Sequence, residues 1–282
     1  MMNLYGLIGF PLGHTFSPGY FREKFAIEEI SDAEYRPFEL ENIDRFPELL
    51  KSMPQLRGLN VTAPHKQTVI KYLTRLHESA RAIEAVNTIK IHEDGSTTGY
   101  NTDVYGFETS LKRFVNRIRE ERFTEETAPG LHLPTIAMSL HLPNKAEVRS
   151  HLGSMDTLVL GTGGASRAVC HVLKRNGVHF RTVSRTAGRG DLTYAELTPN
   201  VLGAYEMIVN TTPLGTFPNV DQLPEFPYAA LERRHHLFDL VYNPEVTSFM
   251  KRGKERGAAV QNGLEMLHLQ ADRAWEIWQD DD

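Results

Sequence analysis

The chain has 282 residues and a formal net charge of −5, with 40% hydrophobic and 24% charged residues. This length suits two domains that each bury a core, and the negative balance excludes a broadly basic surface for nucleic acid or anionic membrane. Cys170 is the single cysteine, which excludes an internal disulfide, and no apolar run reaches the roughly 20 residues of a membrane-spanning helix.

The first stretch of the chain alternates strand-like and helix-like patterns. Residues 4–8 form a short apolar run that predicts a strand. No basic region or small-residue cleavage site accompanies it, so we expect no signal peptide and a cytoplasmic location. Ser17 and Pro18 follow in the order of a helix N-cap and a proline in the first turn. Phe21 and Phe25 lie four residues apart, on one face of that helix.

Residues 35–40 and 56–62 are the next predicted strands, and a helical pattern follows each of them. Residues 85–91 and 97–100 then flank the turn dipeptide Asp94-Gly95, which predicts a β-hairpin. The first hundred residues therefore predict a βα-rich unit that closes with a hairpin.

Residues 114–154 show no clear periodicity. Charged residues gather at 117–122, and Pro129, Pro134 and Pro143 follow. The pattern predicts a helix that continues into a long, inserted surface connection. The histidines here are spaced too widely for a recognisable metal motif, and we expect no metal site.

A second alternating region begins near residue 156. Residues 157–160 predict a buried strand that leads into a glycine-rich turn, and the helical pattern after it stops at Gly177, a residue typical of helix ends. Further short strands are predicted at 178–183, 207–209, 237–241 and 258–260. Strands that alternate with helices indicate a parallel sheet covered on both faces.

The last segment predicts one amphipathic helix. Its apolar residues recur at helical spacing: Leu264, Leu267, Ala271, Trp275 and Trp278.

The glycine-rich turn is a candidate dinucleotide site. Gly161, Gly163 and Gly164 stand between a predicted strand and a predicted helix, where backbone N–H groups can approach a pyrophosphate at the positive helix end. Ser166 occupies the position of the usual third glycine. Such turns also join strands to helices for steric reasons alone, so the turn by itself leaves both interpretations open.

The residues after the next predicted strand favour NADP over NAD. An NAD site places an acidic residue there for the ribose hydroxyls, whereas an NADP site places arginine near the 2′-phosphate. Here Arg185 and Arg189 stand beside Ser184 and Thr186, and no acidic residue precedes Asp191. Guanidinium groups suit a phosphate dianion because they offer full charge and paired donors.

Three short motifs in the first half indicate a substrate site. Thr15 and Ser17 place two hydroxyls beside a helix start, which suits a small carboxylate. Lys66 is predicted in the first turn of a helix just after a strand, and Asp103 is predicted at the start of the helix that leaves the hairpin. By residue type alone, such a lysine and aspartate form a surface ion pair more often than a catalytic pair. Ser17 and Asp103 could also serve only as helix caps.

These motifs, taken in order along nearly the whole chain, resemble the shikimate dehydrogenase family. The matching runs are 11–18, 60–66 (Asn-Val-Thr-Ala-Pro-His-Lys), 85–88 (Ala-Val-Asn-Thr), 101–103 (Asn-Thr-Asp), 161–165 (Gly-Thr-Gly-Gly-Ala), Arg185-Thr186, 210–215, 239–247 and 262–270.

The resemblance implies an NADP-dependent reduction of 3-dehydroshikimate to shikimate, on the route to chorismate and the aromatic amino acids, with Lys66 and Asp103 as the catalytic pair. It implies that the substrate hydroxyls are bound by Asn60, Thr62, Asn87 and Gln270, and the carboxylate by Thr15, Ser17 and Tyr242. It implies cofactor contacts at Gly161, Gly163, Gly164, Ala165, Ser184, Arg185, Thr186, Arg189, Asn210, Gly263 and Met266.

Some positions depart from the family's commonest residues. They are Thr15, Ala63, His65, Ser184 and Glu265. The departures bear on the breadth of substrates and on the strictness for NADP rather than on the catalytic pair.

The expected architecture is a two-domain α/β protein. Residues 1–107, with a returning C-terminal helix at 262–282, form an N-terminal α/β substrate domain; residues 108–261 form a Rossmann-type, doubly wound NADP-binding domain with an insertion around 115–154. Two rival functions stay open: a broader quinate/shikimate dehydrogenase that uses NAD, and a non-catalytic protein that senses NADP or the substrate. We expect a small-molecule substrate, no nucleic-acid or membrane partner, and a monomer or a homodimer.

Overall fold

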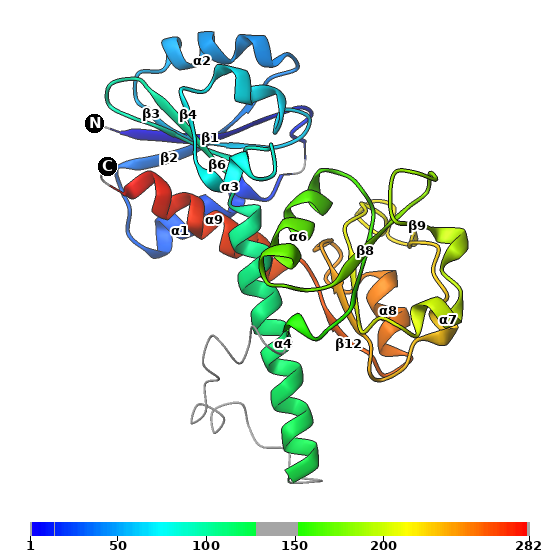
Figure 1. The fold of residues 1–282 in the computed structure, drawn as a ribbon. Coiled ribbons are helices and arrows are strands. Elements are labelled where there is room, and N and C mark those ends of the chain that lie inside the picture. Colours follow the sequence, from blue (N-terminus) through cyan, green and yellow to red (C-terminus); the bar gives the residue numbers. More distant parts are fainter. Residues whose placement is uncertain (1, 14, 128–151, 281–282) are drawn as a thin grey trace. The chain divides into compact units, whose positions relative to one another are not determined.

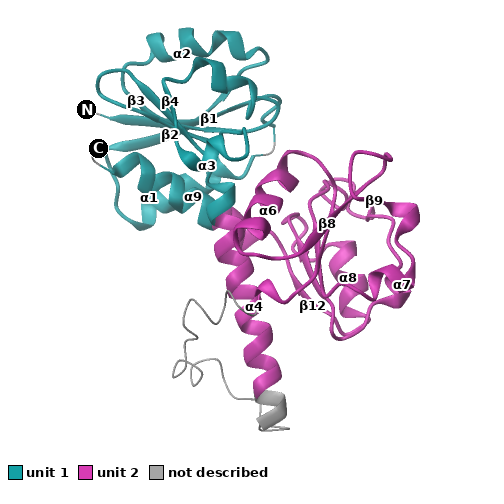
Figure 2. Ribbon diagram, viewed as in Figure 1, with its two compact units in different colours: residues 1–105, 269–282 teal, residues 106–268 magenta. Residues whose placement is uncertain are grey.

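The structure is a computed structural model that describes residues 2–13, 15–127 and 152–280 (Figure 1). The chain divides into two compact units, and each is described by itself (Figure 2). Unit 1 comprises Met1–Tyr105 and Leu269–Asp282, and unit 2 comprises Gly106–His268. The sequence predicts the two borders at residues 107 and 262.

Unit 1 is built on a six-stranded mixed sheet of order β2-β1-β3-β5-β6-β4. The strand β1 pairs in parallel with β2 and β3, and the hairpin β5–β6 adds to β3 in antiparallel fashion. The strands are β1 (Asn3–Gly9), β2 (Ala33–Glu39), β3 (Leu56–Val61), β4 (Arg75–Leu76), β5 (Thr88–Ile91) and β6 (Thr97–Tyr100). The parallel strands β1 and β3 therefore end at the same edge of the sheet.

Helices cover both faces of this sheet (Figure 1). On one face, α1 (Ser17–Ile27) and the part of α9 (Leu264–Gln279) that lies in unit 1 enclose an aromatic cluster. The cluster contains Tyr5, Phe21, Phe25, Ala271, Ala274, Ile277 and Trp278. On the other face, α2 (Phe46–Ser52) contributes Phe46 to an apolar core that also includes Ile8 and Leu59. The short helix α3 (Glu78–Arg81) lies beside β6.

Trp278 fixes the last helix onto the sheet. Its indole Nε1 donates to the Ile89 carbonyl at 3.0 Å, and its ring stacks on Tyr5 with centroids 5.0 Å apart. The ring lies directly over Gly58, where any Cβ atom would overlap it. Glycine at this position is therefore what lets the end of the chain pack flat against β3.

Unit 2 contains a second six-stranded sheet, in which all strands are parallel, of order β12-β11-β10-β7-β8-β9. The strands are β7 (Thr157–Leu160), β8 (Phe180–Ser184), β9 (Leu192–Thr193), β10 (Met207–Asn210), β11 (His236–Asp239) and β12 (Ala259–Gln261). If β7 to β12 are numbered 1 to 6, their order across the sheet, read from β9, is 3-2-1-4-5-6. This is the order of a doubly wound sheet, and its winding reverses between β7 and β10. Ligands bind at such a reversal, beyond the carboxyl ends of the strands.

Successive residues of β11 show that both faces of this sheet are covered. Leu237 packs into a core with Phe249 of α8 (Ser248–Lys254), whereas Phe238 packs edge-on against Phe107 and Phe114 of α4 (Asp103–Thr127). The described part of unit 2 also contains α6 (Gly164–Arg175) between β7 and β8, and α7 (Pro199–Leu202) before β10.

Several predicted elements are confirmed and others are shifted. The strand 157–160 and the helix that stops before Gly177 occur as expected. Ser17 is the first residue of α1 rather than its cap, which is Phe16. The strand predicted from residue 85 begins only at Thr88, because the Val86 N–H donates to the Lys66 carbonyl at 2.7 Å and not to a neighbouring strand.

The other strands differ from their predicted bounds by one to two residues at most ends, which is the usual uncertainty of element boundaries. The stretch predicted to be a helix and a long connection is helical to Thr127; its continuation through residues 128–151 lies outside the described residues. No helix in the described part of the chain is both long and apolar enough to cross a bilayer.

Candidate functional site

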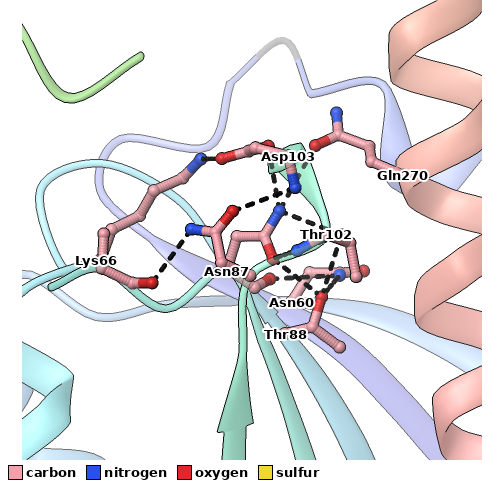
Figure 3. Close-up of polar contacts among 9 residues, drawn as sticks. Asn60, Lys66, Asn87, Thr88, Thr102, Asp103 and Gln270 are labelled. Carbon is pink, nitrogen blue, oxygen red and sulfur yellow. Dashed lines mark hydrogen bonds and ion pairs between the residues drawn. The ribbon is translucent and has the colours of Figure 1, made fainter. Parts of the chain in front are cut away.

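The end of β3, the start of β5, the start of α4 and a side chain of α9 bring a polar cluster together in unit 1 (Figure 3). Lys66 Nζ donates to Asp103 Oδ2 at 2.6 Å. The lysine side chain is 36% exposed and the aspartate 14%, so the pair sits at the rim of the protein interior with its cation reachable from solvent. The predicted pairing of these two residues is present in the structure.

The predicted helical position of Lys66 is wrong. Residues 63–67 form a turn, and a 3-10 helix begins only at Thr68. The Lys66 carbonyl accepts the Val86 N–H, so this peptide is bound to the neighbouring segment instead of to a helical turn. The backbone of Lys66 is thus held by the segment just before the β5–β6 hairpin, and its side chain by Asp103, just after the hairpin.

Asn87 orients the aspartate. Its Nδ2 donates to Asp103 Oδ1 at 2.9 Å, so the two carboxylate oxygens have separate partners, Asn87 and Lys66. The same Nδ2 lies 3.1 Å from Thr102 Oγ1 and 3.4 Å from Gln270 Oε1. Asn87 Oδ1 accepts from the Thr102 N–H at 2.7 Å, which fixes which end of the amide faces the carboxylate. The predicted substrate residues Asn87 and Gln270 thus lie in one network with the pair.

Asn60 extends this network across β3. Its Nδ2 lies 3.3 Å from both Thr88 Oγ1 and the Asn87 carbonyl, and its Oδ1 accepts from the Tyr35 hydroxyl at 2.8 Å. Thr62 follows at the end of the same strand, where its N–H donates to the Ile8 carbonyl at 2.9 Å. Sequence reasoning selects Asn60 and Thr62 but gives no sign of Tyr35.

The remaining predicted substrate residues have different settings. Thr15 and Ser17 are half-buried in unit 1, and Thr15 Oγ1 lies 3.5 Å from the Leu12 carbonyl. Tyr242 belongs to unit 2, where partial burial raises the pKa of its phenol.

Unit 2 has a pocket of about 620 Å³ at the winding reversal between β7 and β10. Six residues that the sequence predicts as cofactor contacts line it: Gly161, Gly163, Ser184, Arg185, Thr186 and Arg189. Sequence reasoning does not select the other lining residues, among which Thr211, Thr212 and Leu214 follow β10. Their place is set by the sheet order, since the strand next to β7 must also end at the pocket.

The glycine turn provides backbone that a pyrophosphate can approach. Gly161 has φ +107°, a left-handed conformation that favours glycine. At Gly163 and Gly164 an added Cβ would meet no atom within 4 Å, so the peptide groups at the start of α6 face open space. Ser166, in place of the third glycine, is buried and donates to the Gly163 carbonyl at 2.7 Å. This turn fits a dinucleotide phosphate.

The charge of the pocket fits a 2′-phosphate. Among the described residues, no carboxylate pairs with Arg185 or Arg189, so both guanidinium groups can bind an anion. Asp191, the first acidic residue after β8, accepts from the Thr182 N–H at 2.7 Å and from its hydroxyl at 2.8 Å. These hydrogen bonds hold the pKa of Asp191 below its usual value. The Asp191 carboxylate is therefore bound to Thr182 of β8 and does not line the pocket. Glu225 is the acidic residue that does line it.

The other predicted cofactor residues do not line this pocket. Gly164 and Ala165 are exposed in the first turn of α6. Gly263 directly precedes α9, and Met266 lies in its first turn. Glu265, one of the departures from the family pattern, accepts from Ser110 at 2.8 Å and pairs with Arg113 at 3.0 Å. Its carboxylate is thus occupied by α4.

Asn210, also predicted to contact the cofactor, points into the protein interior instead. Its side chain is fully buried, with Nδ2 2.9 Å from Asp239 Oδ1 and Oδ1 accepting from the Thr212 N–H at 3.0 Å. This placement favours a role in holding the loop after β10 over direct contact with a ligand.

The buried carboxyl of Asp239 has an unusual pKa. Burial raises its pKa to about 6, although hydrogen bonds from Thr247, the Val241 N–H and Asn210 work in the opposite direction. In the unfolded chain an aspartate titrates near ~4. The folded protein therefore binds this proton more tightly than the unfolded chain does. The ionised carboxyl lowers the free energy of unfolding by its full amount above about pH 6, and this destabilisation disappears below about pH 4.

Replacing Asp239 with asparagine removes this titration. We expect the free energy of unfolding of Asp239→Asn, relative to the parent chain, to rise by about 3 kcal/mol between about pH 4 and about pH 7, since one pKa unit corresponds to about 1.4 kcal/mol. Urea unfolding of both proteins across this range measures the difference. Asp221→Asn, at an exposed position, is the control and should show no such trend. A difference for Asp239→Asn that does not vary with pH would contradict the assignment.

Comparison with known proteins gives one consistent result. Residues 7–89 match the family model described as the shikimate dehydrogenase substrate binding domain. Over 97% of its length the chain is 34% identical to a shikimate dehydrogenase (NADP(+)) of Desulforamulus reducens, of which it covers 88%. Over 99% of its length it is 35% identical to a protein of the same name from Clostridium beijerinckii, of which it covers 93%.

A solved structure is similar along the whole chain. Shikimate 5-dehydrogenase of Thermus thermophilus, in complex with NADP(H) and shikimate, superposes with a TM-score of 0.74 at 26% identity, covering 99% of this chain and 94% of that one. Both α/β units described above therefore have solved counterparts.

Proposed function

The chain belongs to the shikimate dehydrogenase family, and we propose that it catalyses the reversible, NADPH-dependent reduction of 3-dehydroshikimate to shikimate, a step towards chorismate and the aromatic amino acids. The observation that carries this proposal is the Lys66–Asp103 pair, 2.6 Å apart and reachable from solvent. A protein that only bound NADP or the substrate would not need this pair. Cys170, the single cysteine, supports a reducing, cytoplasmic setting.

The pair can perform the proton transfer that ketone reduction requires. Bound NADPH supplies the hydride. The developing alkoxide then needs a positive charge and a proton, and the Lys66 ammonium offers both. Asp103 keeps the ammonium in one place, and Asn87 holds the aspartate by its second oxygen. In the oxidation direction the same lysine accepts the hydroxyl proton of shikimate.

Neutral amide and hydroxyl groups around the pair support recognition of a polyol. We assign Asn60, Thr62, Asn87 and Gln270 to the ring hydroxyls, since a buried polar group left without a partner penalises a substrate that lacks the matching hydroxyl. We assign Thr15, Ser17 and Tyr242 to the carboxylate. Support for the first set comes from the hydrogen bonds that join three of its members beside Asp103: Asn60, Asn87 and Gln270.

We assign NADP to the pocket of unit 2. The open backbone at Gly163 and Gly164 supports binding of the pyrophosphate, and Arg185 and Arg189 support binding of the 2′-phosphate. Ser184 accepts from the Thr186 N–H at 3.2 Å, which shapes the loop that carries both arginines. The serine hydroxyl is thus sufficient to form this turn.

One spectrophotometric assay tests the proposal. The purified chain is mixed with shikimate and NADP, and the appearance of reduced nicotinamide is followed; we expect turnover with this combination and much slower turnover with NAD or with quinate. Comparable rates with quinate and NAD would favour the broader quinate/shikimate dehydrogenase. Binding of NADP or shikimate without turnover would favour a sensing protein and overturn the proposal.

A further inference from the structure

Tyr35 contacts one of the residues of the proposed substrate site, Asn60. It lies on β2, at the edge of the unit 1 sheet, and its hydroxyl donates to Asn60 Oδ1 at 2.8 Å. Asn60 in turn contacts Thr88 and the Asn87 carbonyl, so the phenol is joined through Asn60 to the residues beside Asp103.

The Tyr35 ring is itself held rigidly. It stacks on Phe21 with the ring centroids 4.4 Å apart and an angle of 17° between the planes, and it packs near Trp278 at 6.4 Å. Burial raises the pKa of its phenol above the ordinary value, so the hydroxyl keeps its proton throughout the physiological range. The donor to Asn60 is therefore fixed in position and always present.

The phenol of Tyr35 and the carbonyl of Asn87 together fix how Asn60 faces the site. Oδ1 of the amide accepts from the phenol, and Nδ2 points towards Thr88 Oγ1 and the Asn87 carbonyl, at 3.3 Å from each. A flipped amide would place its oxygen against the Asn87 carbonyl oxygen, and neither atom can donate a hydrogen bond. The network then continues from Thr88 through Asn87 to Asp103.

We propose that Tyr35 is a positioning residue of the substrate site, which sets the place and orientation of the hydroxyl-binding Asn60. This inference rests on the proposed function. Tyr35 itself makes no contact with the reacting atoms in this proposal; it acts by holding the Asn60 amide in one orientation. Its loss should therefore affect the binding of substrate more than the chemical step.

Tyr35→Phe tests the role, because it removes the hydroxyl and keeps the ring. We expect the KM for shikimate to rise about tenfold, with kcat within about threefold and the KM for NADP unchanged. The matched control is Tyr5→Phe. Tyr5 belongs to the same aromatic cluster, and its hydroxyl accepts from Gln279 Nε2 at 3.0 Å, away from Ser17 and Asn60. A merely structural effect would appear in both variants.

The results separate the possible explanations. If Tyr35→Phe and Tyr5→Phe have the same KM for shikimate, the positioning role is overturned while the proposed function stands. A parent chain that neither binds nor oxidises shikimate overturns the proposed function and, with it, this inference. A double-mutant cycle with Asn60→Ala adds a second measurement: the two increases in KM should be less than multiplicative, and fully multiplicative increases would overturn the link through Asn60.

Discussion

Replacing Lys66 with alanine is expected to lower kcat for shikimate oxidation by about a thousandfold or more. The variant loses the group that exchanges the proton and the positive charge that stabilises the alkoxide, and each effect is worth about 10²–10³-fold in comparable enzymes. The side chain is 36% exposed, so its removal leaves no cavity in the core and the fold should persist. Steady-state kinetics, with circular dichroism as a check on folding, measures the loss.

Lys112 offers a closely matched control for this experiment. It pairs with Glu108 at 2.6 Å, and the two side chains are 36% and 16% exposed, nearly the same as in the Lys66–Asp103 pair. An exposed ion pair of this kind contributes about 0–1 kcal/mol to stability. Lys112→Ala should therefore leave kcat within about twofold. Turnover by folded Lys66→Ala at a rate similar to Lys112→Ala would remove the proposed catalytic pair.

The second large effect concerns the choice of cofactor. In the double variant Arg185→Ala, Arg189→Ala we expect the KM for NADP to rise about a hundredfold, since each hydrogen bond to a charged phosphate contributes about 1.5–3 kcal/mol. NAD lacks the 2′-phosphate, so its KM should change by less than about threefold. The ratio of the two KM values is thus the informative quantity.

Arg181 serves as the control for this change. It lies on β8, the same strand that leads to Arg185, and its guanidinium donates to the Asp191 carbonyl at 2.9 Å, outside the pocket. Arg181→Ala should leave the preference for NADP intact. Equal losses of NADP and NAD in the double variant would contradict a contact with the 2′-phosphate and point to a general role of the arginines in shaping the loop.

Residues with a chemical signature could be identified from the sequence. Lys66 and Asp103 stand in short motifs whose order along the chain matches one family, and the structure brings the two together. Arg185 could be found because it follows a strand, a glycine turn and a helix at the spacing of a nucleotide site. In each case the information is local: a charged residue placed just after an element that periodicity predicts.

Residues that act through the fold could not be identified in this way. Tyr35 is 25 positions from Asn60 in the chain, and a tyrosine within a strand is by type a packing residue. Asn210 stands in a motif that signals its importance, yet only the sheet register shows that its amide faces the buried Asp239. The strands β4 and β9, two residues long each, are too short to show an alternating pattern.

The packing of Trp278 over Gly58 also constrains the order in which the protein is made. The ribosome adds Trp278, which covers one face of the unit 1 sheet, only after it has made all six strands of unit 1 and the whole of unit 2. During that interval Tyr5 and Phe21 lack the indole that covers them. The nascent chain therefore carries an uncovered aromatic surface from the synthesis of α1 until that of Trp278, and unit 1 completes its core only after unit 2 has been synthesised.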